Sequence, residues 1–162
     1  MIKIGIDPGP NNGAIAVIAM GTIDLWTIKE FSKTPYYDID KLFKSIRHSA
    51  DRNQEKIYCV IERQIPYAPP NTRRFPAASI GKLMEHYGLL KGLLMSNQIP
   101  FQDPVPRSWM KLYGMKKEEN DTKTTWKNKL KSKAKQLEPH LHIINDNADA
   151  ILIARVAHKF FE

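Results

Sequence analysis

Four carboxylates stand out as residues that could do chemistry together: Asp7, Glu62, Asp146 and Asp149. Asp7 and Glu62 each end an apolar segment, which is where the ligand-binding residues of open α/β sheets lie. Asp146 and Asp149 are three residues apart, so in a helix they share one face. Four acids gathered in one place repel one another and need a counter-charge. A hard divalent cation such as Mg²⁺ accepts oxygen ligands of this kind.

Such a cluster suits the hydrolysis of phosphodiester bonds by two metal ions. One ion activates a water molecule and the other stabilises the leaving oxygen, with the two ions roughly 3.5–4 Å apart. Basic side chains around the acids would hold the nucleic-acid backbone that the acids alone would repel.

Each carboxylate also has an ordinary explanation when it is taken alone. Asp7 could be a turn residue, and Glu62 could pair with one of the arginines that follow it. Asp146 and Asp149 have the spacing of a capping box and suit the positive end of a helix dipole. The functional interpretation therefore depends on whether the fold brings the four acids together.

The first acid follows a segment with the periodicity of a β-strand. Ile2, Ile4 and Ile6 alternate with Lys3, Gly5 and Asp7, which is typical of a half-buried strand. Two further apolar segments, 14–20 and 22–29, predict a three-stranded antiparallel meander.

The second acid is predicted to end a strand parallel to the first. Residues 38–50 have apolar side chains at helical spacing, and residues 56–62 form a short apolar strand. A helix between two strands favours a crossover connection and a parallel pair. Asp7 and Glu62 are therefore expected at the same edge of the sheet.

The second half of the chain is predicted to be mostly helical. A helix is expected at 79–98, followed by a short strand at 99–105. Three further helices are expected after this strand, at 107–113, 122–137 and 146–160. Helix 79–98 has an apolar surface too wide for one contact face, and its three glycines lie on one side, where another backbone could approach closely. The predicted fold class is α/β, a mixed five-stranded sheet flanked by helices in a single domain, residues 1–162.

Positive charge is concentrated in one segment of a basic chain. The net charge is +8, and the segment from Arg107 to Glu138 holds ten basic and four acidic residues. A balance of this size indicates a polyanion as partner. A lysine stripe opposite an apolar stripe is also typical of a solvated helix face, but the excess of bases favours contact with a nucleic-acid backbone.

The composition sets the broad class. Hydrophobic residues make up 42% of the chain and charged residues 26%, as in an ordinary globular domain. No apolar segment is long enough to span a membrane and none reads as a signal peptide, so a cytoplasmic protein without membrane contact is expected. Cys59 lies inside an apolar segment, which predicts a buried, inert thiol.

Three segments, in this order, resemble the RuvC-type Holliday junction resolvases of the RNase H-like superfamily. They are IGIDPGPNNGAIAVI, CVIERQ and NADAILIA, which carry Asp7, Glu62 and Asp149. The similarity covers nearly the whole chain. The segment 105–141 looks most like the phage branch of that family.

The resemblance implies an RNase H-like fold with Asp7, Glu62, Asp146 and Asp149 as the catalytic ligands of Mg²⁺ or Mn²⁺, two ions per site. It implies a homodimer, joined through helix 79–98, that binds a four-way DNA junction and nicks two strands symmetrically. The activity would be that of a crossover-junction endodeoxyribonuclease in DNA recombination and repair. A phage or prophage protein acting in the cytoplasm of a bacterial host cell would fit the phage branch.

The resemblance also implies where DNA would be held. Basic residues before the final helix hold phosphates in the family, and the matching positions here are Lys111, Lys116, Lys117, Lys123 and Lys127. In bacterial members the loop after the second acid carries an aromatic ring near the junction centre, and such a ring can stack on an unpaired base. The corresponding loop here offers Tyr67, Phe75, Arg73 and Arg74.

Other functions stay open on the sequence. The same fold could cut other branched DNA, such as three-way junctions, forks and flaps, or RNA. A non-catalytic DNA-binding module is a further alternative, although binding a polyanion alone would favour loss of the four acids. A nucleotide-phosphate binder of the actin and sugar-kinase type shares the first hairpin, but that fold needs two such domains and a far longer chain.

Overall fold

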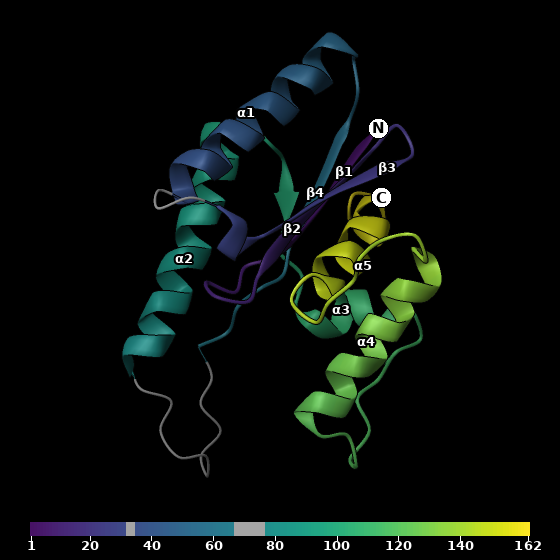
Figure 1. Ribbon diagram of the computed structural model, residues 1–162. Coiled ribbons are helices and arrows are strands. Elements are labelled where there is room, and N and C mark those ends of the chain that lie inside the picture. The colour runs from purple at the N-terminus through teal and green to yellow at the C-terminus, as the bar shows by residue number, and fades with distance from the viewer. Residues whose placement is uncertain (32–34, 67–76) are drawn as a thin grey trace.

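The structure is a computed structural model of the 162-residue chain, and it describes residues 1–31, 35–66 and 77–162. A twisted central sheet has α1 and α2 on one face and α3, α4 and α5 on the other (Figure 1). The strands of this sheet follow the order β3-β2-β1-β4-β5. The predicted α/β class, with a mixed five-stranded sheet flanked by helices, is confirmed.

The sheet combines the predicted meander with two parallel strands. Its strands are β1 (Ile2–Asp7), β2 (Ala14–Ala19), β3 (Thr22–Thr27), β4 (Ile57–Ile61) and β5 (Phe101–Gln102). β1, β2 and β3 pair antiparallel, and β4 runs parallel to β1 with Ile6 opposite Ile61. The fifth strand is shorter than the predicted 99–105, since only two residues pair with β4.

Two long helices cover one face of the sheet. They are α1 (Pro35–Arg52) and α2 (Ala77–Ser96). Phe43 of α1 and Leu90 and Leu94 of α2 are fully buried in the core that includes the isoleucines of β1. α1 begins three residues before the predicted start, because Pro35 suits the first turn of a helix, where no backbone N–H partner is needed.

Three shorter helices cover the other face. They are α3 (Pro106–Lys111), α4 (Lys123–Leu137) and α5 (Ala148–Val156), the last followed by a 3₁₀ turn (Ala157–Phe160). Thr122 caps α4 by accepting a hydrogen bond from the Thr125 N–H at 3.1 Å. α5 begins two residues later than predicted, because Asn147 holds the preceding residues in a turn by accepting from the Ile144 N–H at 3.0 Å.

Gly5 allows α5 to lie directly on β1. A Cβ atom at Gly5 would stand 2.2 Å from the Ala150 carbonyl oxygen and 2.3 Å from the Ala154 nitrogen, both backbone atoms of α5. No side chain larger than hydrogen fits there unless the helix moves. The glycine between Ile4 and Ile6 therefore sets the distance between the first strand and the helix that carries Asp149.

Two expectations from composition can be compared with the fold. Cys59 is fully buried, and its burial raises the pKa of the thiol, as expected for an unreactive cysteine. Within residues 1–31, 35–66 and 77–162, no helix has both the length and the apolar character needed to cross a membrane.

Candidate active site

Three of the four predicted acids lie together at one end of the sheet. Asp7 is the last residue of β1, and Glu62 directly follows β4, where its N–H donates to the Ile6 carbonyl at 2.9 Å. Asp149 lies in the first turn of α5, which packs across β1 and β2. The three side chains come from segments far apart in the sequence and meet at the carboxyl ends of parallel strands, as predicted.

The acids disturb one another's ionisation. Burial raises the pKa of Asp7 to about 7, with a further contribution from the Asp149 carboxylate. Burial raises the pKa of Glu62 to about 8, and the charges of Asp7 and Asp149 add to it. The pKa of Asp149 is also raised, by burial, and its side chain is only 6% exposed. Carboxylates this close hold protons at neutral pH unless positive charge is supplied.

Lys127 supplies part of that positive charge from within the protein. Its ammonium group forms an ion pair with Asp149 Oδ2. Burial alone would lower the pKa of Lys127, but the carboxylates of Asp149, Asp7 and Glu62 outweigh this and raise it. The residue predicted as a DNA contact thus lies among the acids, on the half-buried side of α4.

Asp146 lies beside this group and was not expected in its observed position. The prediction that it shares a helix face with Asp149 is wrong, because α5 begins at Ala148 and Asp146 belongs to the preceding turn. It forms an ion pair with Lys29 at 3.1 Å, and its charge is the weakest of those that raise the pKa of Asp7. Lys29 had no predicted role, and nothing in its sequence neighbourhood indicates one.

Trp109 is a second residue that the sequence did not single out for the site. It was predicted to be a core residue, and its side chain is fully buried. Its indole Nε1–H also donates to Glu62 Oε2 at 2.8 Å. This bond holds one oxygen of Glu62 in place and lowers the pKa of that carboxyl against the effect of burial.

Replacing Trp109 with phenylalanine tests this positioning role. Phenylalanine keeps an aromatic ring in the core but cannot donate, so the pKa of Glu62 should rise and its carboxyl should lose its orientation. We expect the titration profile of the Glu62 carboxyl, followed by NMR, to shift to higher pH. A profile identical to that of the wild type would contradict the role, while Trp126→Phe controls for loss of an indole elsewhere on this face of the sheet.

The donor set fits a hard divalent cation. In the part of the chain that the structure describes, no group of three or more His, Cys, Asp or Glu side chains has the arrangement of a formed metal site. The cluster nevertheless offers carboxylate oxygens, and Asp149 Oδ1 is buried without a hydrogen-bond partner. An unsatisfied buried acceptor is costly, and a cation would satisfy it. The assignment of Asp7, Glu62, Asp146 and Asp149 as metal ligands stays a prediction.

The raised pKa values predict how stability depends on pH in the absence of divalent ions. Asp7 and Glu62 have folded-state pKa values of about 7 and about 8, against ordinary values of 3.8 and 4.5. The folded state therefore binds more protons than the unfolded state between these limits, and the free energy of unfolding falls as pH rises through this window. Urea titrations from pH 5 to about 8.5 should show this fall, and Glu62→Gln should reduce its slope. A wild-type slope equal to that of the variant would contradict the prediction.

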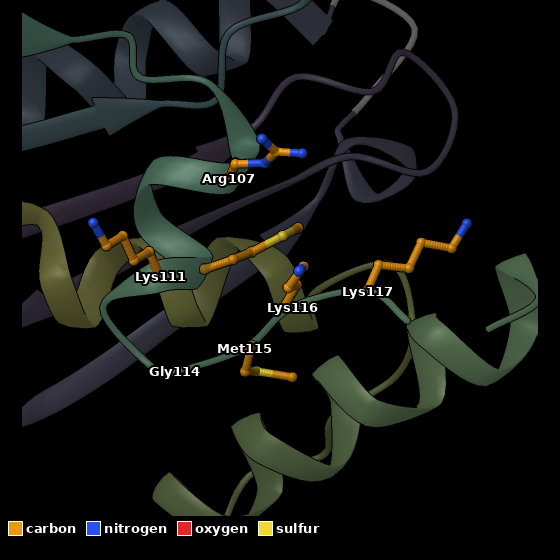
Figure 2. Close-up of a pocket in the computed structure, with 7 residues that line it drawn as sticks. Arg107, Lys111, Gly114, Met115, Lys116 and Lys117 are labelled. Carbon is orange, nitrogen blue, oxygen red and sulfur yellow. The ribbon is translucent and has the colours of Figure 1, made fainter. Parts of the chain in front are cut away.

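The remaining lysines predicted to contact DNA lie outside the acid cluster. Lys111, Lys116, Lys117 and Lys123 are all exposed. The first three surround a pocket between α3 and the segment that follows it (Figure 2). Lys123 is the first residue of α4, the helix that also carries Lys127. The basic segment therefore contains one lysine that faces the acids and several that are free to meet a partner.

The other predicted DNA contacts lie outside the described residues. These are Tyr67, Arg73, Arg74 and Phe75 in the loop between β4 and α2. Arg63, just after Glu62, pairs with Asp103 at 2.8 Å, and Asp103 also accepts from Lys91 and Tyr87. The start of this loop is thus anchored to α2 and to the end of β5.

Comparison with solved structures identifies proteins that have the same fold as this chain. Neither the family models nor the curated protein sequences contain a match to this chain. The structure of RuvC from Thermus thermophilus matches at 18% identity with a TM-score of 0.55, over 99% of this chain and 95% of that one. RuvC from the same organism in complex with a Holliday junction substrate matches at 16% identity with a TM-score of 0.57, over 99% and 94%. The chain therefore has a RuvC-like fold, with three acids gathered at the carboxyl ends of its parallel strands.

Proposed function

We propose that this chain is a metal-dependent, structure-selective DNA endonuclease that resolves four-way junctions by paired nicks. The observation that carries the proposal is the meeting of Asp7, Glu62 and Asp149 beside a basic surface, where burial raises the pKa of all three and the Asp149 charge raises those of Asp7 and Glu62 further. The likeness in fold to a RuvC structure solved with a Holliday junction substrate supports this choice of substrate.

The residues of the site have two proposed roles: some would bind cations, and others orient or neutralise the carboxylates. Asp7, Glu62 and Asp149 would bind Mg²⁺ or Mn²⁺, with Asp146 at the margin. Two such ions, when bound, supply an activated water and stabilise the leaving oxygen. Trp109 orients the Glu62 carboxylate. Lys127 pairs with Asp149 in the folded protein, which lets the acids stay close without an ion.

The exposed lysines supply the affinity for the polyanion. Lys111, Lys116, Lys117 and Lys123 are exposed, and ammonium groups that contact DNA phosphates release condensed counterions. Binding should therefore weaken as salt is raised. Because phosphate contacts carry no sequence information, these lysines would orient the DNA and leave the choice of strand to other contacts.

A homodimer would provide the two active sites that symmetric nicking needs. One side of α2 faces away from the core: a Cβ atom at Gly81, Gly88 or Gly92 would meet nothing within 4 Å. Leu89 and Met95 flank these glycines and are 40% and 68% exposed. A glycine-lined stripe with apolar side chains beside it allows a second helix to approach closely, and this supports the interface proposed through residues 79–98.

Replacing Leu89 with glutamate should separate the two protomers. The side chain is exposed in a single chain, so folding should be retained, but a charge buried in an interface without a partner is strongly unfavourable. We expect the dimer dissociation constant, measured by sedimentation velocity, to rise at least about 10-fold, and paired nicking to fall with it.

Met20→Glu is the matched control, because Met20 is 83% exposed in the turn between β2 and β3. A wild-type protein that is monomeric at micromolar concentration would remove the dimer from the proposal.

The function is tested with a panel of DNA substrates of the same sequence. Purified protein is incubated with four-way, three-way, flap and linear DNA, with and without Mg²⁺, and the products are mapped on both strands. The proposal expects symmetric nicks near the branch point of the four-way junction, only with the metal ion. Equal cutting of linear duplex would contradict structure selectivity, and preferred cutting of three-way DNA, flaps or RNA would favour the alternatives with the same fold.

A further inference from the structure

A pocket of about 530 Å³ lies between α3 and the segment that follows it. Four cations and two methionines line it: Arg107, Lys111, Lys116, Lys117, Met110 and Met115. In Figure 2, Arg107 and Lys111 extend from the two ends of α3, while Lys116 and Lys117 extend from the segment beyond Gly114. Its volume falls within the range of roughly 300–1,000 Å³ that small-molecule sites occupy.

The positive charge of this pocket has no acidic partner in the part of the chain that the structure describes. None of its four cations forms an ion pair with any residue the structure describes. Other lysines on the same side of the sheet are paired, as Lys127 is with Asp149 and Lys129 with Asp121. Four unpaired cations around one hollow attract an anion.

The two methionines give the pocket an apolar wall that phosphate binding alone does not need. Met110 and Met115 are half-buried and pack against the core on this face of the sheet. A methionine side chain is polarisable, adapts its shape and packs favourably on aromatic rings. An apolar wall beside cations matches a molecule with a flat aromatic part and a phosphate, which is the chemistry of a nucleotide.

α3 connects this pocket to the acid cluster. Successive residues of a helix are about 100° apart, so Arg107 and Lys111 point away from Trp109, and Met110 points between these two directions. Trp109 donates to Glu62, and the opposite side of the same short helix lines the pocket. A nucleotide held there would lie across α3 from Trp109, the residue that donates to Glu62.

We propose that this pocket takes one unpaired nucleotide of the branched DNA substrate, with its base against Met110 and Met115 and its phosphate on the surrounding cations. The inference rests on the proposed nuclease function and extends it to the choice of substrate. Bases in a continuous duplex are stacked and paired, whereas a branch point offers a base that can be turned out at lower cost. The pocket would thus favour branched over linear DNA.

The test separates contact with the base from contact with the phosphate. Two four-way junctions are compared: one has a single unpaired adenine at the branch point, and the other has an abasic residue there with its phosphate intact. Affinity is measured by fluorescence anisotropy without divalent ions, so that the strands stay whole. Met110→Ala should weaken binding of the adenine junction about five-fold and leave binding of the abasic junction unchanged.

Three variants serve as comparisons. Met110→Leu keeps an apolar side chain of similar size and should retain the preference for the adenine junction. Lys116→Ala should weaken binding of both junctions by the same factor, since it removes a phosphate contact. Met20→Ala makes the same chemical change in an exposed turn at the opposite end of the sheet and should behave as the wild type.

The outcomes distinguish this inference from the function on which it rests. Equal effects of Met110→Ala on the two junctions would overturn the base pocket while leaving junction cleavage intact. Failure of the wild type to bind or cut any branched DNA would overturn both. If Met110→Ala does not fold, 2-aminopurine at the unpaired position gives a second measurement. Its fluorescence should change when the wild type binds, and an unchanged emission would overturn the inference. Saturation of the pocket by free deoxyadenosine monophosphate, without any effect of the unpaired base in the junction, would do the same.

Discussion

Replacing Asp7 with asparagine is expected to reduce junction cleavage by roughly 10³-fold or more, the scale on which enzymes lose activity when one member of a catalytic group is removed. Asparagine has nearly the same shape, but it is neutral and offers a single carbonyl oxygen. The cluster would lose the negative charge of the Asp7 carboxylate, which lies beside those of Glu62 and Asp149. Single-turnover cleavage of a four-way junction in excess Mg²⁺ measures the loss directly.

The same variant should bind the junction as well as the wild type or better. Removing a negative charge from a site proposed to bind DNA reduces repulsion, and the lysines proposed to contact phosphates are unchanged. Asp24→Asn is the matched control, because Asp24 is an exposed aspartate of the edge strand β3 and should keep full activity. Cleavage by Asp7→Asn at the wild-type rate would refute the assignment of the site.

Replacing Gly5 with alanine is expected to lower the free energy of unfolding by about 3 kcal/mol, at the upper end of the cost of overpacking a core. The added methyl group would stand 2.2 Å from the Ala150 carbonyl oxygen and 2.3 Å from the Ala154 nitrogen. Both are backbone atoms, so no side-chain rotation relieves the contact, and α5 must move away from β1. Urea titration at pH 6 measures the loss.

The movement of α5 should also reach the active site, because Asp149 lies in the first turn of that helix. Cleavage should fall further than DNA affinity under conditions where the variant is still folded. Ser45→Ala is the comparison for stability, since Ser45 is exposed in α1 and alanine should leave the free energy of unfolding unchanged or raise it slightly. An unfolding free energy for Gly5→Ala within about 0.5 kcal/mol of the wild type would show that the helix adjusts without cost.

Local patterns in the sequence were sufficient to predict the sheet. Alternating isoleucines predicted β1, and the helix between β1 and β4 predicted their parallel pairing, because a crossover connection has few other solutions. The fold class and the placement of Asp7 beside Glu62 followed from these two features. The ends of α1 and α5 were predicted less well, since proline and asparagine near a helix start act through turn geometry that apolar spacing does not show.

The composition of the acid cluster was predicted in part. Asp7 and Glu62 are at strand ends, where the backbone alone determines position, and both were placed correctly. Asp149 was expected to face the sheet and does, but Asp146 lies in a turn and pairs with Lys29. Helical spacing could not reveal this, because the start of α5 depends on the hydrogen bonds of Asn147.

The sequence by itself determined the fold class, the strand ends that carry the first two acids, and the concentration of positive charge before the last helix. Only the tertiary structure decided that Lys127 lies among the acids, that Trp109 donates to Glu62, and that Arg107, Lys111, Lys116 and Lys117 surround a pocket with two methionines. The physical reason is the sequence separation between the residues that interact. Strand and helix periodicity act between residues close in sequence, whereas the contact between Trp109 and Glu62 spans 47 residues and depends on how two layers of helices pack on one sheet.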